Sequence, residues 1–158
     1  MQRSPPRPHV IAGRDTVEPL GPGRLGGDTP TRAEGPSMTN VAELMRRNLL
    51  DVFNERDPER RAEAIAEIYA EDVVWHEPDR VIHGREALAV RAAEFLAGAP
   101  DWVFETAGPV SVTADVGHLG FLFGPAGAPV VTGMDIAHCK DGVITELYTL
   151  IVEAPQPS

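Results

Sequence analysis

Residues 69–88 read YAEDVVWHEPDRVIHGREAL, and they join two kinds of secondary structure. The run Val73–His76 is typical of a short strand, and Pro78-Asp79 after it predicts a turn. Val81–His83 is a second short extended piece. Gly84 interrupts the chain before a helical pattern begins. We therefore expect a short β element set between helices.

Three amphipathic helices are predicted around this element. The first starts at Thr39, and the second starts at Asp57-Pro58, where Asp57 can cap the helix and Pro58 suits its first turn. The third starts at Gly84 and ends at Gly98 and Pro100. Their apolar stripes are Val41, Leu44, Met45, Asn48 and Val52, then Ala62, Ile65, Ile68 and Tyr69, then Leu88, Ala92, Phe95 and Leu96.

Four longer strands are predicted after the third helix. Asp141-Gly142 predicts a tight hairpin turn, and Gly124–Pro129 a longer hairpin loop. Because strands joined by hairpins are antiparallel, we expect an α+β fold. In it, a cone-shaped, curved antiparallel sheet packs on three helices from the N-terminal half around one pocket. The strands are Trp102–Val112, Val116–Phe123, Val130–Cys139 and Val143–Val152.

Composition changes sharply near residue 37. Residues 1–37 hold 7 Pro and 6 Gly and no apolar period, so they cannot bury enough surface to offset chain entropy. We expect a disordered leader there. Met38 precedes the helix-capping residues Thr39-Asn40, and we expect the natural start at Met38. The folded domain is expected over 38–153, followed by a flexible tail over 154–158.

The chain is acidic. Its 24 Asp and Glu residues exceed its 14 Lys and Arg residues, for a net charge of −10. This balance argues against nucleic acid and against anionic membranes as partners. The one cysteine, Cys139, cannot form an internal disulfide, which is compatible with the cytoplasm. We expect a cytoplasmic protein whose partner is a small apolar molecule.

Two carboxylates interrupt apolar surroundings. Asp135 shares a strand face with small and apolar residues, and burial there would raise its pKa and let the acid donate to an oxyanion. The alternative is that this face is solvated. Glu77 ends a strand just before Pro78, where it could take a proton from a ligand at the mouth of a cavity. The alternative is a loop acid in water.

The histidines are further candidates. His118 could be a pocket base, or it could be packed or solvated. His76 alternates with Trp75, so one of the two should face inward. The histidines and acids show neither HxH nor HExxH spacing, and we expect no metal site and no cofactor.

Residues 69–78, followed by Ile82–Leu88, resemble the middle of a ketosteroid isomerase, a member of the SnoaL-like, nuclear-transport-factor-2-like superfamily. Members of that family run Tyr-Ala-acid-acid, a short strand, acid-Pro and His-Gly-Arg-Glu. The resemblance implies that Glu77 stands at the position of the general base and Asp135 at that of the protonated oxyanion-hole acid. The tyrosine of that oxyanion hole falls near Asn48, whose amide could donate instead.

The same scaffold is similar to polyketide cyclases, dehydratases, limonene-epoxide-hydrolase-like enzymes and inert ligand binders. Such cyclases use a strand Asp with a His, which Asp135 with His118 or His76 could supply. Such hydrolases use Asp-Arg-Asp, and the strand of Asp135 has no neighbouring arginine. Substrate contacts are expected from Asn48, Trp75, His76, Phe95, Met134 and Tyr148.

Two functions follow from this resemblance. One is a cofactor-independent proton-transfer enzyme, an isomerase, cyclase or dehydratase, that acts through Glu77 and Asp135, with His118 as a further candidate. The other is a non-catalytic ligand-binding or dimerisation module. A homodimer is expected with either function, because an exposed apolar sheet face favours self-association.

Overall fold

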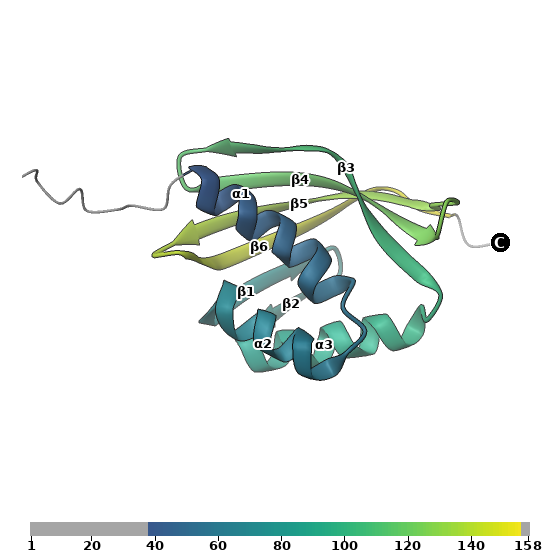
Figure 1. The fold of residues 1–158 in the computed structure, drawn as a ribbon, viewed down its shortest axis with the longest axis horizontal. Coiled ribbons are helices and arrows are strands. Elements are labelled where there is room, and N and C mark those ends of the chain that lie inside the picture. Colours follow the sequence, from purple (N-terminus) through teal and green to yellow (C-terminus); the bar gives the residue numbers. More distant parts are fainter. Residues whose placement is uncertain (1–37, 156–158) are drawn as a thin grey trace, which may run out of the picture. The chain divides into compact units, whose positions relative to one another are not determined.

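The computed structural model describes residues 38–155, and the predicted leader lies outside them. Helices precede most of the strands along the chain, as predicted, and the α+β class is confirmed (Figure 1). The elements are α1 (Met38–Arg47), the π-helical segment η1 (Asn48–Phe53), α2 (Pro58–Ile68), β1 (Tyr69–Glu77), β2 (Arg80–His83), α3 (Arg85–Gly98), β3 (Trp102–Thr113), β4 (Val116–Pro125), β5 (Val131–Lys140) and β6 (Val143–Glu153).

The six strands form one curved sheet in the order β2-β1-β6-β5-β4-β3. The hairpin-linked pairs are antiparallel, as predicted. The predicted antiparallel arrangement has one exception, because β1 pairs with β6 in parallel. No hairpin joins these two strands, because β2, α3 and β3–β5 lie between them in sequence, so their direction was not set by a turn.

Helix α1 lies across the concave face of the sheet (Figure 1). A glycine lets it approach β4 closely. A Cβ atom at Gly117 would lie 2.6 Å from Met45 Cγ and 2.9 Å from Val41 Cγ1. Because Met45 and Val41 would have to shift to admit a Cβ at so short a distance, the absence of a side chain at Gly117 allows the helix to pack this closely.

The predicted stripe of the first helix is buried throughout. Its last part is a π-helix, which is rare and is often found at functional sites. Leu49 and Phe53 widen the stripe there and are also buried. This segment therefore turns Asn48, Leu49 and Phe53 towards the interior, beneath the sheet.

Asp57 caps α2 as predicted. Its Oδ1 accepts hydrogen bonds from the backbone N–H groups of Glu59 and Arg60, at 2.9 and 3.1 Å. These bonds lower the pKa of Asp57. The predicted stripe of this helix is wrong at Ala62, which is exposed, while Arg61 is buried.

Tyr69 was predicted on the second helix, but it is the first residue of β1. Its backbone is extended, with φ −110° and ψ 146°, and it pairs with Ile144 of β6. Pairing with a distant strand thus overrides the local helical pattern. The predicted Asp141-Gly142 turn is confirmed, with φ angles of 52° and 80°.

Candidate functional site

A pocket of about 350 Å³ lies between the helices and the concave sheet face, and its wall is mainly aromatic. Phe104 is at the centre of this wall. Its ring centroid lies 4.2 Å from that of Phe123 and 5.3 Å from that of Phe121. Phe53 packs against Trp75 with centroids 5.1 Å apart. Rings drawn from helix and sheet thus make a rigid apolar chamber.

Two polar residues in the link between η1 and α2 hold this wall in place. The Asn54 side chain donates to the Phe104 carbonyl oxygen at 2.9 Å and accepts from the Phe104 N–H at 2.7 Å. Arg56 donates to the carbonyl oxygens of Leu96, Ala99 and Trp102, at 2.7, 2.8 and 2.6 Å. Neither residue was predicted from the sequence, since a structural polar residue in a linker cannot be told by its pattern from an exposed one.

Asp135 reaches the pocket from β5, on the inward face that alternation predicted. Only 4% of the residue is exposed. Its Oδ2 accepts from Asn48 Nδ2 at 2.8 Å, and its Oδ1 accepts from Thr149 Oγ1 at 2.7 Å. Burial raises the pKa of Asp135 to about 6, although the Thr149 and Asn48 hydrogen bonds oppose that rise.

The hydrogen bonds around Asp135 all point towards it. Trp75 Nε1 donates to Thr149 Oγ1 at 3.0 Å, and an indole N–H can only donate. Thr149 therefore accepts there and has its own hydrogen available for Asp135. Tyr69 donates its phenolic hydrogen to Asn48 Oδ1, which leaves the amide NH₂ for Asp135. Both neighbours thus favour the ionised acid.

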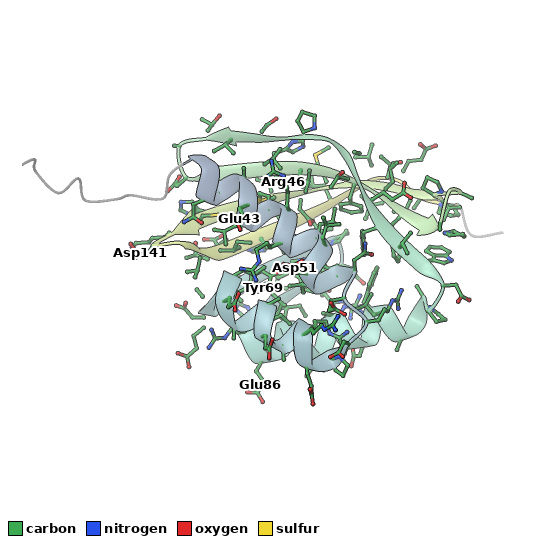
Figure 2. All side chains as sticks on the ribbon, in the orientation of Figure 1. Glu43, Arg46, Asp51, Tyr69, Glu86 and Asp141 are labelled. Atoms are coloured by element: carbon green, nitrogen blue, oxygen red, sulfur yellow. The ribbon has the colours of Figure 1, made fainter. Side chains whose placement is uncertain are left out.

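Tyr69 belongs to this network, although the sequence pattern predicted it only on the apolar stripe of a helix. The resemblance indicated an Asn in place of a catalytic tyrosine, yet the fold brings the phenol of Tyr69 directly to Asn48. Tyr69 is buried at the start of β1, and its side chain turns inward, whereas those of Glu86 and Asp141 point outward (Figure 2). Burial raises the pKa of Tyr69 well above 10, with a smaller contribution from the charge of Asp135, so the phenol stays protonated.

Glu77 lines the same pocket as Asp135, at the end of β1. Its side chain is 9% exposed and accepts a bidentate pair from Arg91, with Nε to Oε2 at 2.9 Å and Nη2 to Oε1 at 3.0 Å. Arg80 Nε lies 3.7 Å from Glu77 Oε2. Arg91 was missed, although it lies on α3 between Leu88 and Phe95 of the predicted apolar stripe, where a charged residue is a sign of a buried partner.

Other predicted site residues are distributed over both sheet faces. Phe95 and Trp75 line the pocket. His118 and Met134 alternate with the buried residues of β4 and β5, so they lie on the opposite face from Asp135. The expected pairing of His118 with Asp135 is therefore not formed, since neighbouring residues of a strand point to opposite faces.

His76 and Tyr148 also lie outside the pocket. Their rings stack with centroids 4.4 Å apart and planes 2° apart, and Tyr148 donates to the carboxylate of Glu146. Trp75 is the inward member of its pair, so His76 does not reach Asp135. Among residues 38–155, no three His, Cys, Asp or Glu side chains come together as metal ligands.

No helix in the described part of the chain is long and apolar enough to cross a membrane.

Solved structures with this fold come from several bacteria. A SnoaL-like family protein of Agrobacterium tumefaciens, with a suggested isomerase activity, is 22% identical with a TM-score of 0.67, over 72% of this chain and 98% of that one. A Jannaschia protein suggested to be a SnoaL-like polyketide cyclase is 15% identical with a TM-score of 0.63, over 75% and 90%. A limonene-epoxide-hydrolase-like epoxide hydrolase of Mycobacterium tuberculosis is 13% identical with a TM-score of 0.55, over 72% and 84%. At these identities the likeness concerns the fold.

No curated protein matches the chain in sequence. The family model of the SnoaL-like domain matches residues 47–147, which run from the end of α1 to the middle of β6 and include Asn48, Glu77 and Asp135. The chain therefore belongs to the SnoaL-like family.

Proposed function

We propose that the protein is a cofactor-independent enzyme that transfers a proton on a small apolar substrate, as an isomerase, cyclase or dehydratase does. The observation that supports this proposal is the buried carboxyl of Asp135, which faces an aromatic pocket with a pKa of about 6. A general acid or base is most effective when its pKa lies near the working pH. The pKa of Asp135 meets that condition at near-neutral pH.

In the proposed step, the Asp135 carboxylate removes a proton from a carbon next to a substrate carbonyl, and the C–H electron pair forms an enolate. Protonated Asp135 then returns the proton to the substrate at the same or another carbon. The electrons balance within the substrate, so the step needs no oxidant or reductant. Thr149 and Asn48 hold the carboxyl in one orientation throughout.

The role of Glu77 differs from the one that the family resemblance implied. Because both of its oxygens accept hydrogen bonds from Arg91, we assign proton transfer to Asp135 and substrate binding to Glu77. Each carboxylate oxygen keeps a further lone pair for a ligand. Asp135 is the better candidate for proton transfer because its bonds come from a neutral amide and a neutral hydroxyl.

Hydrogen exchange on an enolisable ketone tests this proposal without knowledge of the natural substrate. The probe is 2-tetralone in D₂O, and the exchange at its α carbon is followed by NMR. We expect the wild type to accelerate the exchange, with a rate that rises with pH through about 6. Asp135→Asn should abolish the acceleration, and Asp141→Asn, at an exposed hairpin, should keep it.

The same assay separates the enzyme from the alternative, a non-catalytic binding module. A wild-type protein that binds 2-tetralone and leaves its exchange at the buffer rate supports the binding module. Equal acceleration by the wild type and by Asp135→Asn contradicts the proposed role of Asp135.

We also propose a homodimer formed through the outer sheet face. Val116, Tyr148, Leu150 and Val152 are exposed there on β4 and β6, and burial of this surface would stabilise an assembly. Light scattering should give twice 17.0 kDa, and Leu150→Glu should reduce the mass to that of one chain. A single-chain mass for the wild type would exclude the dimer. A cytoplasmic location remains the expectation, since Cys139 is a buried free thiol.

A further inference from the structure

The size of the pocket limits what it can hold. A cavity of about 150 Å³ in another protein accepts benzene, and the pocket here is about 350 Å³. Its wall is built largely of rings, including Phe53, Phe95, Phe104 and Trp102. Flat aromatic ligands gain most from such walls, because ring faces and edges can pair. The space is suited to about two fused rings.

The polar side chains of the pocket act mainly as acceptors. Glu77, Asp135 and Thr149 line it, and the Thr149 hydroxyl donates its hydrogen to Asp135. The indole N–H of Trp75 is used by Thr149. On these four side chains, the unused lone pairs of the two carboxylates remain available to accept a hydrogen bond from a ligand. A ligand that brings a hydrogen-bond donor can therefore bind these acceptors, while Trp102, which also lines the pocket, carries the indole N–H that a ligand carbonyl would need.

No lysine, arginine or histidine is among the residues that line this pocket. The cation behind it, Arg91, is bound through Nε and Nη2 to Glu77. A ligand carboxylate would lose its hydration beside Glu77 and Asp135 without a positive partner, which is unfavourable. A ligand ammonium would lose its hydration as well, and Asp135 would be its only carboxylate partner without a cation, because Glu77 is already neutralised by Arg91. An uncharged hydroxyl avoids both costs.

We infer that the ligand is an uncharged aromatic compound of about two rings that carries a hydroxyl group, and that the pocket excludes the carboxylate of the same shape. This inference rests on the proposed function only in that the ligand faces Asp135. The hydroxyl donates to Asp135 or Glu77, while the rings lie against Phe104 and its neighbours.

Three probes with one ring system test this inference by calorimetry at pH 7.5, without any turnover. They are 2-naphthalenemethanol, 2-naphthoate and 2-naphthylmethylammonium. We expect the alcohol to bind at least about tenfold more tightly than the carboxylate, and more tightly than the ammonium. Asp135→Asn, whose amide can donate, should reduce the difference in affinity between the alcohol and the carboxylate. Asp141→Asn should leave this difference unchanged.

Equal or tighter binding of 2-naphthoate would overturn the exclusion of anions. Tightest binding of the ammonium would show that the pocket selects a cation, and no binding of any probe would overturn the two-ring class. Hydrogen exchange on 2-tetralone is measured independently of these binding results. The ligand class and the proton-transfer function can therefore fail independently.

Discussion

The indole nitrogen of Trp75 lies 3.0 Å from the hydroxyl oxygen of Thr149, and this contact orients the hydrogen bond that Thr149 donates to Asp135. The indole N–H of Trp75, which can donate but cannot accept, is the first donor in the hydrogen-bonded chain Trp75–Thr149–Asp135. The ionised form of Asp135 is favoured by this chain and disfavoured by burial. The pKa of about 6 is the balance of these opposed effects.

Removing the Thr149 hydroxyl should shift this balance. In Thr149→Val the shape is nearly kept, but the bond to the carboxylate is lost, so the pKa of Asp135 should rise above about 6. The pKa can be measured by following the Asp135 carboxyl carbon by NMR against pH. Thr145→Val is the matched control, because Thr145 lies on the same strand and donates instead to the His138 carbonyl oxygen at 3.1 Å. An unchanged pKa in Thr149→Val would show that the bond has no influence.

The raised pKa of Asp135 should make stability depend on pH. The folded-state pKa of about 6 exceeds the ordinary 3.8, so the folded protein holds the extra proton between these values. The stability from this group is full below pH 3.8 and is lost as pH rises through 6. Relative to Asp135→Asn, the wild-type free energy of unfolding should fall by up to about 3 kcal/mol from pH 4 to 7.5.

Urea unfolding of both proteins at several pH values measures that difference, in which the other titrating groups cancel. Asp141→Asn serves as the control, since Asp141 is exposed in a hairpin turn and Asn tolerates its φ of 52°. A wild-type curve parallel to that of Asp135→Asn would mean that Asp135 is not perturbed by folding.

Gly133 should control the shape of the pocket. A Cβ there would lie 2.4 Å from Phe121 Cζ and 2.7 Å from the Leu150 carbonyl oxygen. The whole Phe121 side chain would have to shift, and the Leu150 carbonyl oxygen is held in the sheet, so Gly133→Ala should cost about 1–3 kcal/mol of stability. It should also weaken 2-naphthalenemethanol binding, because Phe121 lines the pocket.

Gly98→Ala is the comparison for that change. A Cβ at Gly98, the last residue of α3, meets nothing within 4 Å. We expect its stability to be equal to or slightly above that of the wild type, with unchanged binding. Equal behaviour of the two variants in thermal unfolding and calorimetry would contradict the close packing at Gly133.

The Glu77–Arg91 pair should be coupled. Arg91→Met leaves the nearly buried Glu77 carboxylate without its bidentate partner, and we expect a loss of about 2 kcal/mol. The double variant Glu77→Gln with Arg91→Met should cost less than the sum of the single changes, because no unpaired charge remains. Arg80→Met should cost under about 1 kcal/mol, since that side chain is 45% exposed. Additive losses in a double-mutant cycle would argue against the pairing.

Local patterns were enough to predict much of the fold. Asp57 before Pro58 predicted the start of α2, and Asp141-Gly142 predicted the last hairpin. Alternation predicted the inward face of β5 and hence the burial of Asp135. The error at Tyr69 arose because its strand partner, Ile144, lies far along the chain, so no local signal marks the pairing.

The site could be predicted only in part, since it depends on contacts between distant segments. Asn48 and Asp135 are 87 positions apart, yet they share a hydrogen bond. Trp75 and Thr149 meet only because β1 and β6 are parallel neighbours. The position of Arg91 on an apolar helix stripe was a usable signal, but its partner Glu77 could not be read from spacing alone.

The proposed proton transfer depends above all on the proton affinity of Asp135 in the folded protein. This affinity can be measured by an NMR pH titration of the aspartate carboxyl carbons, with Asp135→Asn to assign the resonance. We predict a pKa of about 6 for Asp135. A value near the ordinary 3.8 would contradict both its burial in the pocket and its proposed role in proton transfer.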